Sequence, residues 1–273
     1  MPLFTVQNLH TWYPVKRGFL ARTVDHVRAV NGVSFTLDAG RTLGVVGQSG
    51  SGKSTLARTI LKLEKPRSGE ILLDGQDIAR LRGSALRAYR RSVQVVFQDP
   101  FASLNPRLTV LQLVTEGMMA HGITTAAKRR ADATALLAQV GLDAAALDRY
   151  PHAFSGGQRQ RVCIARALSL KPRLLICDEA VSALDLSIRA QILNLLLELQ
   201  KRHGLAYLFI THDLSVVQHV ADTLAVMHQG RFVEHGPTEE IVTNPQTPYT
   251  RQLLKDQLTI ECNRAQSNAI EKN

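Results

Sequence analysis

The segment GQSGSGKS, from Gly47 to Ser54, constrains the fold of this 273-residue chain more than any other part of its sequence. Its glycines let the backbone curl so that successive N–H groups point inward, and a following helix adds partial positive charge. The segment fits the pattern G-x-x-x-x-G-K-[S/T] and lies between a predicted strand and a predicted helix, as that pattern requires. It therefore predicts a phosphate-binding loop. The alternative is a glycine-rich turn that binds no ligand.

Three side chains of this loop have specific roles in that interpretation. Lys53 would reach the β- and γ-phosphates of a nucleotide, and the Ser54 hydroxyl would ligate Mg²⁺. Thr55 would touch the α-phosphate. The predicted nucleotide contacts of the loop are Gly47, Gln48, Ser49, Gly50, Ser51, Gly52, Lys53, Ser54 and Thr55.

Strand-like and helical segments alternate along the chain, which predicts a mainly parallel sheet covered by helices on both faces. Between about residues 99 and 155 the segments are rich in Ala and Leu and helical, which predicts an inserted helical subdomain. Gly141 and Gly204 mark predicted helix ends, and Gln229-Gly230 marks a hairpin turn. The predicted strands are 4–9, 33–40, 69–78, 92–98, 173–180 and 205–213, and the predicted helices include 108–122, 126–142 and 187–204.

Composition narrows the class of protein. The net charge of +10 indicates an acidic partner, such as nucleic acid, phospholipid headgroups or a phosphorylated ligand, or else a solvated basic surface. Cys163, Cys177 and Cys262 lie far apart without metal-ligand spacing, so we expect free thiols in a reducing compartment. The N-terminus lacks the apolar stretch of a secretion signal, and no apolar run approaches the about 18–20 residues of a membrane span. We therefore expect a soluble, cytoplasmic protein.

Asp178 and Glu179 end the apolar strand RLLICDEA. Because ligands of open α/β sheets bind at the carboxyl ends of the strands, we expect both acids to face the nucleotide. Asp178 is then the partner of Mg²⁺, and Glu179 polarises the attacking water as a general base. The alternative is a pair of acids that cap the next helix.

Two further polar side chains follow predicted strands. Gln98 ends the strand SVQVVFQ at the border of the helical block, where its amide could ligate Mg²⁺ or the attacking water; the alternative is a surface amide. His212 follows the apolar strand in LFITHD, at the predicted sheet edge that also carries Lys53 and Asp178. The alternative for His212 is a structural role.

Ser155, Gly156 and Gly157 open a predicted basic amphipathic helix, FSGGQRQRVCIARAL. They could form an N-cap whose exposed N–H groups hold an anion, which would be a second anion site in this chain. The alternative is an ordinary capped helix in which Arg159 and Arg161 are solvated charges.

The motifs GQSGSGKST, VVFQDP, FSGGQRQR, LLICDEA, SALD and FITHD occur in this order. The set resembles the nucleotide-binding subunits of ABC transporters, from the N-terminus to about residue 255. The segments FQDPFASLNPRLTV, DEAVSALDLSIRAQILNLL and GPTEEIVTNPQTPYTRQLL are similar to ATP-binding subunits of bacterial peptide and nickel importers. The chain ends soon after Cys262, where many peptide-importer subunits continue, which leans toward nickel or metal-chelate members and leaves the substrate open.

The resemblance implies an α/β fold. Its core is a P-loop NTPase (RecA-like) core with a mainly parallel sheet, to which an antiparallel β subdomain and an inserted α-helical subdomain are added. The nucleotide-binding domain would span residues 1–255, with the helical subdomain at about 99–155, and a polar tail would follow at 256–273.

The resemblance also implies that two subunits pack head to tail, with each ATP between the phosphate loop of one and the Ser-Gly-Gly turn of the other. Ser155 and Gly157 would then serve the γ-phosphate of a partner subunit's ATP. Gln98 would link the nucleotide to the membrane subunits, His212 would contact the γ-phosphate, and Asp185 would line the dimer seam.

The remaining site assignments follow from the same resemblance. An aromatic residue near the N-terminus would stack on adenine; spacing favours Tyr13, with Trp12 as the alternative. The implied cofactors are ATP and Mg²⁺, with Ser54, Gln98 and Asp178 as metal ligands. The implied catalytic residues are Lys53, Gln98, Glu179 and His212.

The expected function is ATP hydrolysis coupled to the uptake of peptides, nickel or metal chelates. The expected partners are a second ATP-binding subunit (a paralogue or a second copy), two transmembrane permease subunits and a solute-binding protein, with no nucleic acid. The protein would lie at the cytoplasmic face of the membrane. The alternative is a soluble ABC-type ATPase that acts on nucleic acid or the ribosome, for which the positive charge would be an electrostatic footprint.

Overall fold

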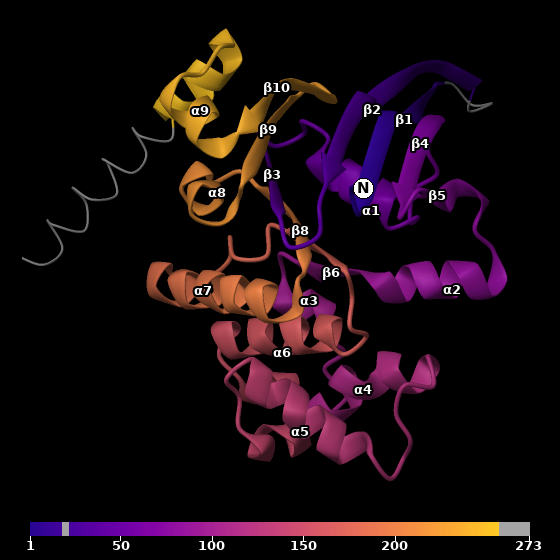
Figure 1. The fold of residues 1–273 in the computed structure, drawn as a ribbon, viewed down its shortest axis with the longest axis vertical. Coiled ribbons are helices and arrows are strands. Elements are labelled where there is room, and N and C mark those ends of the chain that lie inside the picture. The colour runs from indigo at the N-terminus through magenta and orange to yellow at the C-terminus, as the bar shows by residue number, and fades with distance from the viewer. Residues whose placement is uncertain (18–21, 257–273) are drawn as a thin grey trace, which may run out of the picture. The chain divides into compact units, whose positions relative to one another are not determined.

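The computed structural model describes residues 1–17 and 22–256, and the chain divides into two compact units (Figure 1). The boundaries fall inside four strands, β1 (Phe4–Arg17), β2 (Arg22–Leu37), β4 (Ser68–Leu73) and β8 (Ala206–Thr211), so each unit takes part of these strands. Unit 1 comprises Met1–Thr5, Thr36–Arg41 and Glu70–Phe209, and unit 2 comprises Val6–Phe35, Thr42–Gly69 and the chain from Ile210 onward.

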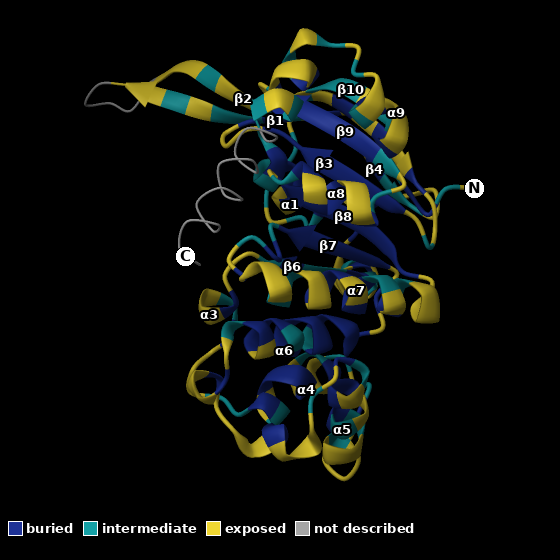
Figure 2. Cartoon of the chain, turned by 90° about the vertical axis from the view of Figure 1, so that its left-hand side faces the viewer, coloured by how far each residue is buried: buried dark blue, intermediate teal, exposed yellow. Residues whose placement is uncertain are grey.

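Unit 1 is built on parallel strands and on helix α6. Strand β6 runs parallel to β7, with paired residues from Val93↔Leu174 to Phe97↔Asp178, and every residue of β7 is buried. Helix α6 packs against β6, α4, α5 and α7, and Figure 2 shows it largely dark blue, as expected for a central helix. The elements are β5 (Gln76–Asp77), η1 (Ile78–Arg80), α2 (Gly83–Ser92), β6 (Val93–Phe97), α3 (Pro100–Ser103), α4 (Val110–Ala120), α5 (Arg129–Gln139), η2 (Ala144–Asp148), η3 (Pro151–Ala153), α6 (Gly156–Leu168), β7 (Leu174–Asp178) and α7 (Leu186–His203).

Unit 2 is built around β3 (Thr42–Val46), which runs parallel to β9 (Thr223–His228). Strand β9 pairs antiparallel with β10 (Arg231–Pro237), and the two-residue turn between them has φ of +46° at Gln229 and +80° at Gly230. This confirms the predicted hairpin. The other elements are α1 (Lys53–Ile60), α8 (Leu214–Val220) and α9 (Thr238–Thr243), and a further helix begins at residue 248.

An apolar cluster holds α8, α9 and the chain after residue 248 against the strands of unit 2. Buried Leu214 and Val217 of α8 meet Val46 at the end of β3, and Ile241 and Leu253 complete the cluster from the C-terminal side. This packing anchors the end of β3, from which the predicted phosphate loop departs.

Most predicted elements are present, but their lengths differ. Helices α5 and α7 end before Gly141 and Gly204, whose φ values of +69° and +64° confirm the predicted glycine stops. Strands β1 and β2 are much longer than the predicted 4–9 and 33–40. Helix α2 was missed: it is short and basic, and Tyr89 is its only buried residue, so few apolar side chains mark it in the sequence. The predicted tail lies, apart from residue 256, outside the described residues.

Cys163 and Cys177 are free, as predicted, and both are buried, while Cys262 lies outside the described residues. Burial raises the pKa of the Cys163 thiol to about 11, so this thiol stays protonated at neutral pH. Among residues 1–17 and 22–256, no helix has the length and apolar character to cross a bilayer.

Gly44 of β3 tests the packing of α8 on the sheet. A Cβ at this position would lie 2.3 Å from Val217 Cγ1 and 3.1 Å from Ala221 Cβ. We therefore expect Gly44→Ala to lower the free energy of unfolding by about 1–3 kcal/mol through overpacking, measured by urea denaturation. Gly236→Ala is the control, because its Cβ would lie 3.9 Å from Ile241 Cδ1, an ordinary contact. Equal stability of the two variants would contradict this packing.

Candidate functional site

The predicted phosphate loop lies in unit 2, between β3 and α1. Its shape requires glycine at Gly52, where φ is +111° and a Cβ would lie 1.9 Å from the backbone oxygen of Ala29. The loop is also held from outside, since the N–H of Gly230 donates to the Ser51 backbone oxygen over 2.9 Å. The loop conformation is therefore imposed by the surrounding strands.

Lys53 places its charge inside this loop. The side chain is only 5% exposed, and Nζ donates to the backbone oxygens of Gly47 (2.7 Å) and Gln48 (3.0 Å). Helix α1 begins at Lys53, and no side chain makes a capping hydrogen bond at its start. A curled glycine backbone, an uncapped helix start and an ammonium group together fit a phosphate group.

Sequence reasoning missed one contact of the loop. The N–H of Gln48 donates to the Tyr249 hydroxyl over 3.3 Å, and the Tyr249 ring lies 4.0 Å from the His228 ring between centroids. No local pattern could show this, because Tyr249 is 201 residues away from Gln48 in the chain.

Unit 1 brings together Gln98, Asp178 and Glu179. Strand β6 ends at Phe97, which pairs with Asp178, the last residue of β7. Gln98 and Glu179 each follow directly, so the three predicted side chains lie at one edge of the parallel sheet. Asp178 is buried at 9% exposure, whereas Gln98 is exposed.

Glu179 has a strained backbone. Its φ of +52° lies in the left-handed region, which costs a residue other than glycine about 1–3 kcal/mol. The Glu179 backbone oxygen accepts hydrogen bonds from the Ser182 N–H (3.1 Å) and the Ser182 hydroxyl (2.9 Å), which help to hold this conformation. Such strain persists where surrounding contacts impose it, and it occurs at functional sites more often than elsewhere.

Ser155 caps α6 as predicted. Its hydroxyl accepts from the Gln158 N–H (3.4 Å), while the Gln158 side chain accepts from the Ser155 N–H (3.1 Å), which makes a capping box. Close packing against α7 requires glycine at Gly157, because a Cβ there would lie 2.5 Å from Ile188 Cγ2. Gly156 has no such restriction, since its Cβ would lie 3.7 Å from Leu184. The capped helix is thus shown, and its contact with an anion stays a prediction.

The alternative in which Arg159 is a solvated charge is wrong. Arg159 is 8% exposed, its Nε donates to the Pro151 backbone oxygen over 2.6 Å, and its guanidinium lies 3.7 Å from the Phe101 ring centroid. Arg161 is likewise bound, donating to the Val140 backbone oxygen over 2.6 Å. Arg161 satisfies the carbonyl of the residue after α5, where the helix bonds stop. The Pro151 oxygen also accepts from the Phe154 N–H over 3.2 Å, so Arg159 gives it a second, charged donor.

Trp12 and Tyr13 are adjacent residues of β1, so their side chains point to opposite faces of the strand. The guanidinium carbons of Arg28 and Arg67 lie 4.9 and 4.5 Å from the Trp12 ring centroid. Trp12 is therefore already engaged by two cations, and Tyr13 stays the predicted adenine contact.

Two other predicted residues lie at element ends. His212 is exposed and directly follows β8, in the same unit as the phosphate loop. Asp185 is exposed at the N-cap position of α7, in unit 1, but its side chain makes no capping hydrogen bond. Both residues are exposed to solvent.

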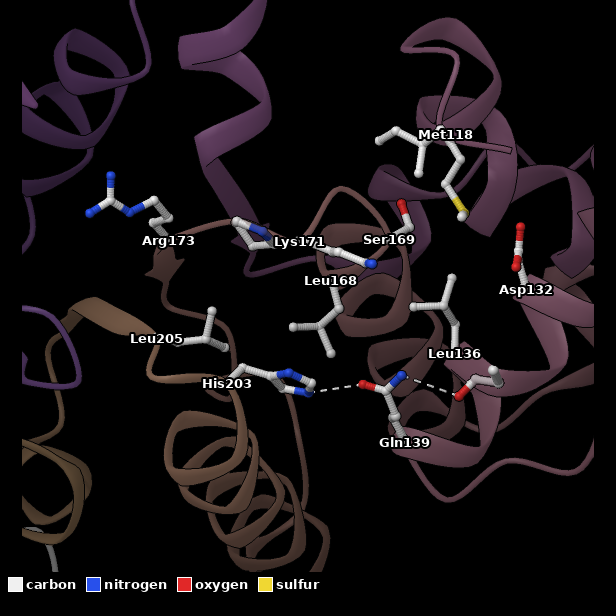
Figure 3. A pocket seen from close by; sticks show the side chains of 13 residues that line it. Met118, Asp132, Leu136, Gln139, Leu168, Ser169, Lys171, Arg173, His203 and Leu205 are labelled. Carbon is white, nitrogen blue, oxygen red and sulfur yellow. Dashed lines mark hydrogen bonds between the residues drawn. The ribbon is translucent and has the colours of Figure 1, made fainter. Parts of the chain in front are cut away.

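Unit 1 also contains a cavity of about 660 Å³ that includes none of the predicted site residues (Figure 3). Leu136, Leu168 and Met118 give it an apolar lining, and the His203 ring is hydrogen-bonded to Gln139 Oε1 over 2.9 Å. Burial and the neighbouring Arg202 lower the pKa of His203. Because acidic and basic side chains both line the cavity, it favours no single class of ligand.

The fold and the loop first define the class of the protein, an α/β P-loop NTPase. A solved structure of the ATP-binding cassette MJ0796, a dimer in a post-hydrolysis state with ADP and Pi, is 29% identical and superposes with a TM-score of 0.75. The match covers 86% of this chain and 98% of that one. The family model described as ABC transporter matches residues 30–182, so the chain belongs to the ABC transporter family.

Curated relatives share about half of its residues. The probable peptide ABC transporter ATP-binding protein y4tS of Sinorhizobium fredii is 52% identical over 252 residues, which are 92% of this chain and 71% of that protein. The glutathione import ATP-binding protein GsiA of Pectobacterium atrosepticum is 50% identical over 253 residues, or 93% of this chain. This chain spans 41% of the length of GsiA.

Arg159 should be important for the stability of unit 1. We expect Arg159→Met to lower the free energy of unfolding by about 1.5–3 kcal/mol, because buried carbonyls would lose a charged donor. Urea denaturation followed by circular dichroism measures the change. Arg107→Met is the control, since this exposed side chain makes no hydrogen bond within the described part of the chain. A variant as stable as the control would contradict the buried hydrogen bonds.

Proposed function

We propose that this chain is the ATP-hydrolysing subunit of a bacterial ABC importer. The observation that carries the proposal is the phosphate loop, in which Gly52 is sterically required and the Lys53 ammonium is held within the curled backbone. Membership of the ABC transporter family supports ATP as the nucleotide.

The proposed cargo is a peptide. The two curated relatives are named for peptide transport and for import of glutathione, itself a tripeptide. These names favour small peptides. The family resemblance in the sequence had instead favoured nickel or a metal chelate. The proposed partners are two transmembrane permease subunits and a solute-binding protein, with this chain bound peripherally at the cytoplasmic face of the membrane.

Catalysis in this proposal depends on positioning and on charge. Loop N–H groups and Lys53 bind the β- and γ-phosphates, and His212 contacts the γ-phosphate. Glu179 accepts a proton from the attacking water as a general base. Mg²⁺ would neutralise phosphate charge when bound, and Ser54, Gln98 and Asp178 offer the oxygen donors that this hard cation prefers.

The proposed active form is a dimer of ATP-binding subunits. The capped start of α6, with Ser155 and Gly157, serves the γ-phosphate of the nucleotide bound by the partner, which is a second copy or a paralogue. The MJ0796 cassette, which is a dimer in a post-hydrolysis state with ADP and Pi, supports a dimeric form. ATP favours the closed dimer, and hydrolysis with product release reopens it, which drives the permeases.

Replacement of the general base tests the proposed chemistry. We expect Glu179→Gln to bind ATP but to hydrolyse it about 10²–10⁴-fold more slowly, because a general base usually accelerates a reaction by that factor. Phosphate release measures the rate, and light scattering should show an ATP-dependent dimer, alone or with the paralogue. Glu198→Gln, on the exposed face of α7, is the control. Near-normal turnover in Glu179→Gln would remove Glu179 from this role.

Replacement of Lys53 tests the phosphate loop. We expect Lys53→Ala to bind ATP about 10- to 100-fold more weakly, since hydrogen bonds to charged groups contribute about 1.5–3 kcal/mol. Titration calorimetry measures the affinity, and circular dichroism checks that the variant is folded. Lys65→Ala, which removes an exposed ammonium of unit 2, should bind as the wild type does. Unchanged affinity in Lys53→Ala would count against the loop as the phosphate site.

A further inference from the structure

Gln160 connects helix α6 to the turn that follows β7. The residue is fully buried, and its Nε2 donates to the Ala180 backbone oxygen over 2.6 Å. Ala180 is the residue after Glu179, and all three belong to unit 1. Gln160 lies in the segment FSGGQRQR, but no role was predicted for it from the sequence, because its partner is a main-chain atom 20 residues away.

The turn that Gln160 holds includes the strained Glu179, with its φ of +52°. Ser182 supplies two hydrogen bonds to the Glu179 backbone oxygen from within the turn. Gln160 supplies a further hydrogen bond from a different element. Because a left-handed backbone persists only where contacts impose it, a donor fixed on a buried helix helps to hold this conformation.

The oxygen atom of the Gln160 amide destabilises the fold. This atom, Oε1, is buried and has no hydrogen-bond partner within residues 1–17 and 22–256. A buried acceptor without a partner destabilises a fold, and an apolar side chain of similar length would avoid that cost. Stability alone therefore does not account for a glutamine at this position.

We infer that Gln160 is a positioning residue that fixes the orientation of Glu179 through the Ala180 carbonyl. The inference rests on the proposed role of Glu179 as the general base. Gln160 lies on the helix that begins with Gly156 and Gly157, so one hydrogen bond joins α6 to the residue after the proposed base. Because Gln160 is fully buried, it would act without touching the nucleotide.

The first test separates turnover from binding. Gln160→Met keeps the length of the side chain and removes its donor, so kcat should fall about 10- to 100-fold, as for a misplaced catalytic group. The KM for ATP should change less than about twofold, because the phosphate loop is untouched. Gln139→Met is the matched control: it removes the hydrogen bond to His203 in the same unit and should leave kcat unchanged. An unchanged kcat in Gln160→Met would overturn the inference.

The second test uses pH to restore the donor. In Gln160→Glu, a protonated carboxyl can donate to the Ala180 carbonyl, whereas the ionised form cannot and repels it. Burial raises the pKa of such a carboxyl, so the ratio of variant to wild-type kcat should rise as the pH falls. The same ratio for Gln160→Met should stay constant, and melting temperatures at each pH exclude unfolding as the cause. A constant ratio for Gln160→Glu would contradict the role of the donor.

The third test is a double-mutant cycle with Glu179→Gln. If Gln160 acts through Glu179, Gln160→Met should lower the residual turnover of Glu179→Gln by less than about twofold. The same fold-loss in both backgrounds would overturn the inference and leave the proposed function standing. Near-normal turnover in Glu179→Gln alone would instead remove Glu179 from the proposed role of general base, and a wild-type protein that did not hydrolyse ATP would overturn the proposed function, so these failures are distinguishable.

Discussion

The close approach of two backbones at Gly52 is the constraint on which the rest of the candidate site depends. Any side chain there would collide with the Ala29 carbonyl, so the strand, the loop and α1 have one relative arrangement within unit 2. That arrangement directs the loop N–H groups inward and places Lys53 among the loop carbonyls. The proposed affinity for phosphate would thus depend on a steric requirement at Gly52 and on the charge of Lys53.

Helix α6 has a corresponding role in unit 1. Its start is capped by Ser155, Arg159 binds the turn before it, and Gln160 reaches the turn after β7. Near its other end, Arg166 donates to the Ser103 backbone oxygen in α3 over 2.5 Å, close in sequence to Gln98. Polar contacts of one buried helix therefore reach the segments that follow both β6 and β7, where the proposed catalytic side chains lie.

Local patterns in the sequence were sufficient to predict those features that depend on a residue type with one conformational preference, such as glycine at a positive φ. Examples are the glycine stop at Gly204, the hairpin at Gln229-Gly230 and the strand–loop–helix unit around Gly52. Helix α2 was missed because almost no side chain of it is buried. The burial of Arg159 was missed because its partners are main-chain oxygens. Every residue has such an oxygen, so the sequence does not show which one a side chain will reach; tertiary packing decides it. Contacts with the nucleotide stay predictions for the same reason.

The two guanidinium groups beside Trp12 have a spectroscopic consequence. This indole is the only one in the 273-residue chain and belongs to unit 2. Its emission therefore reports on that unit alone, and adjacent cations would shift it according to their orientation. The protein thus contains an intrinsic fluorophore on the opposite face of β1 from Tyr13, next to the residue predicted to stack on adenine.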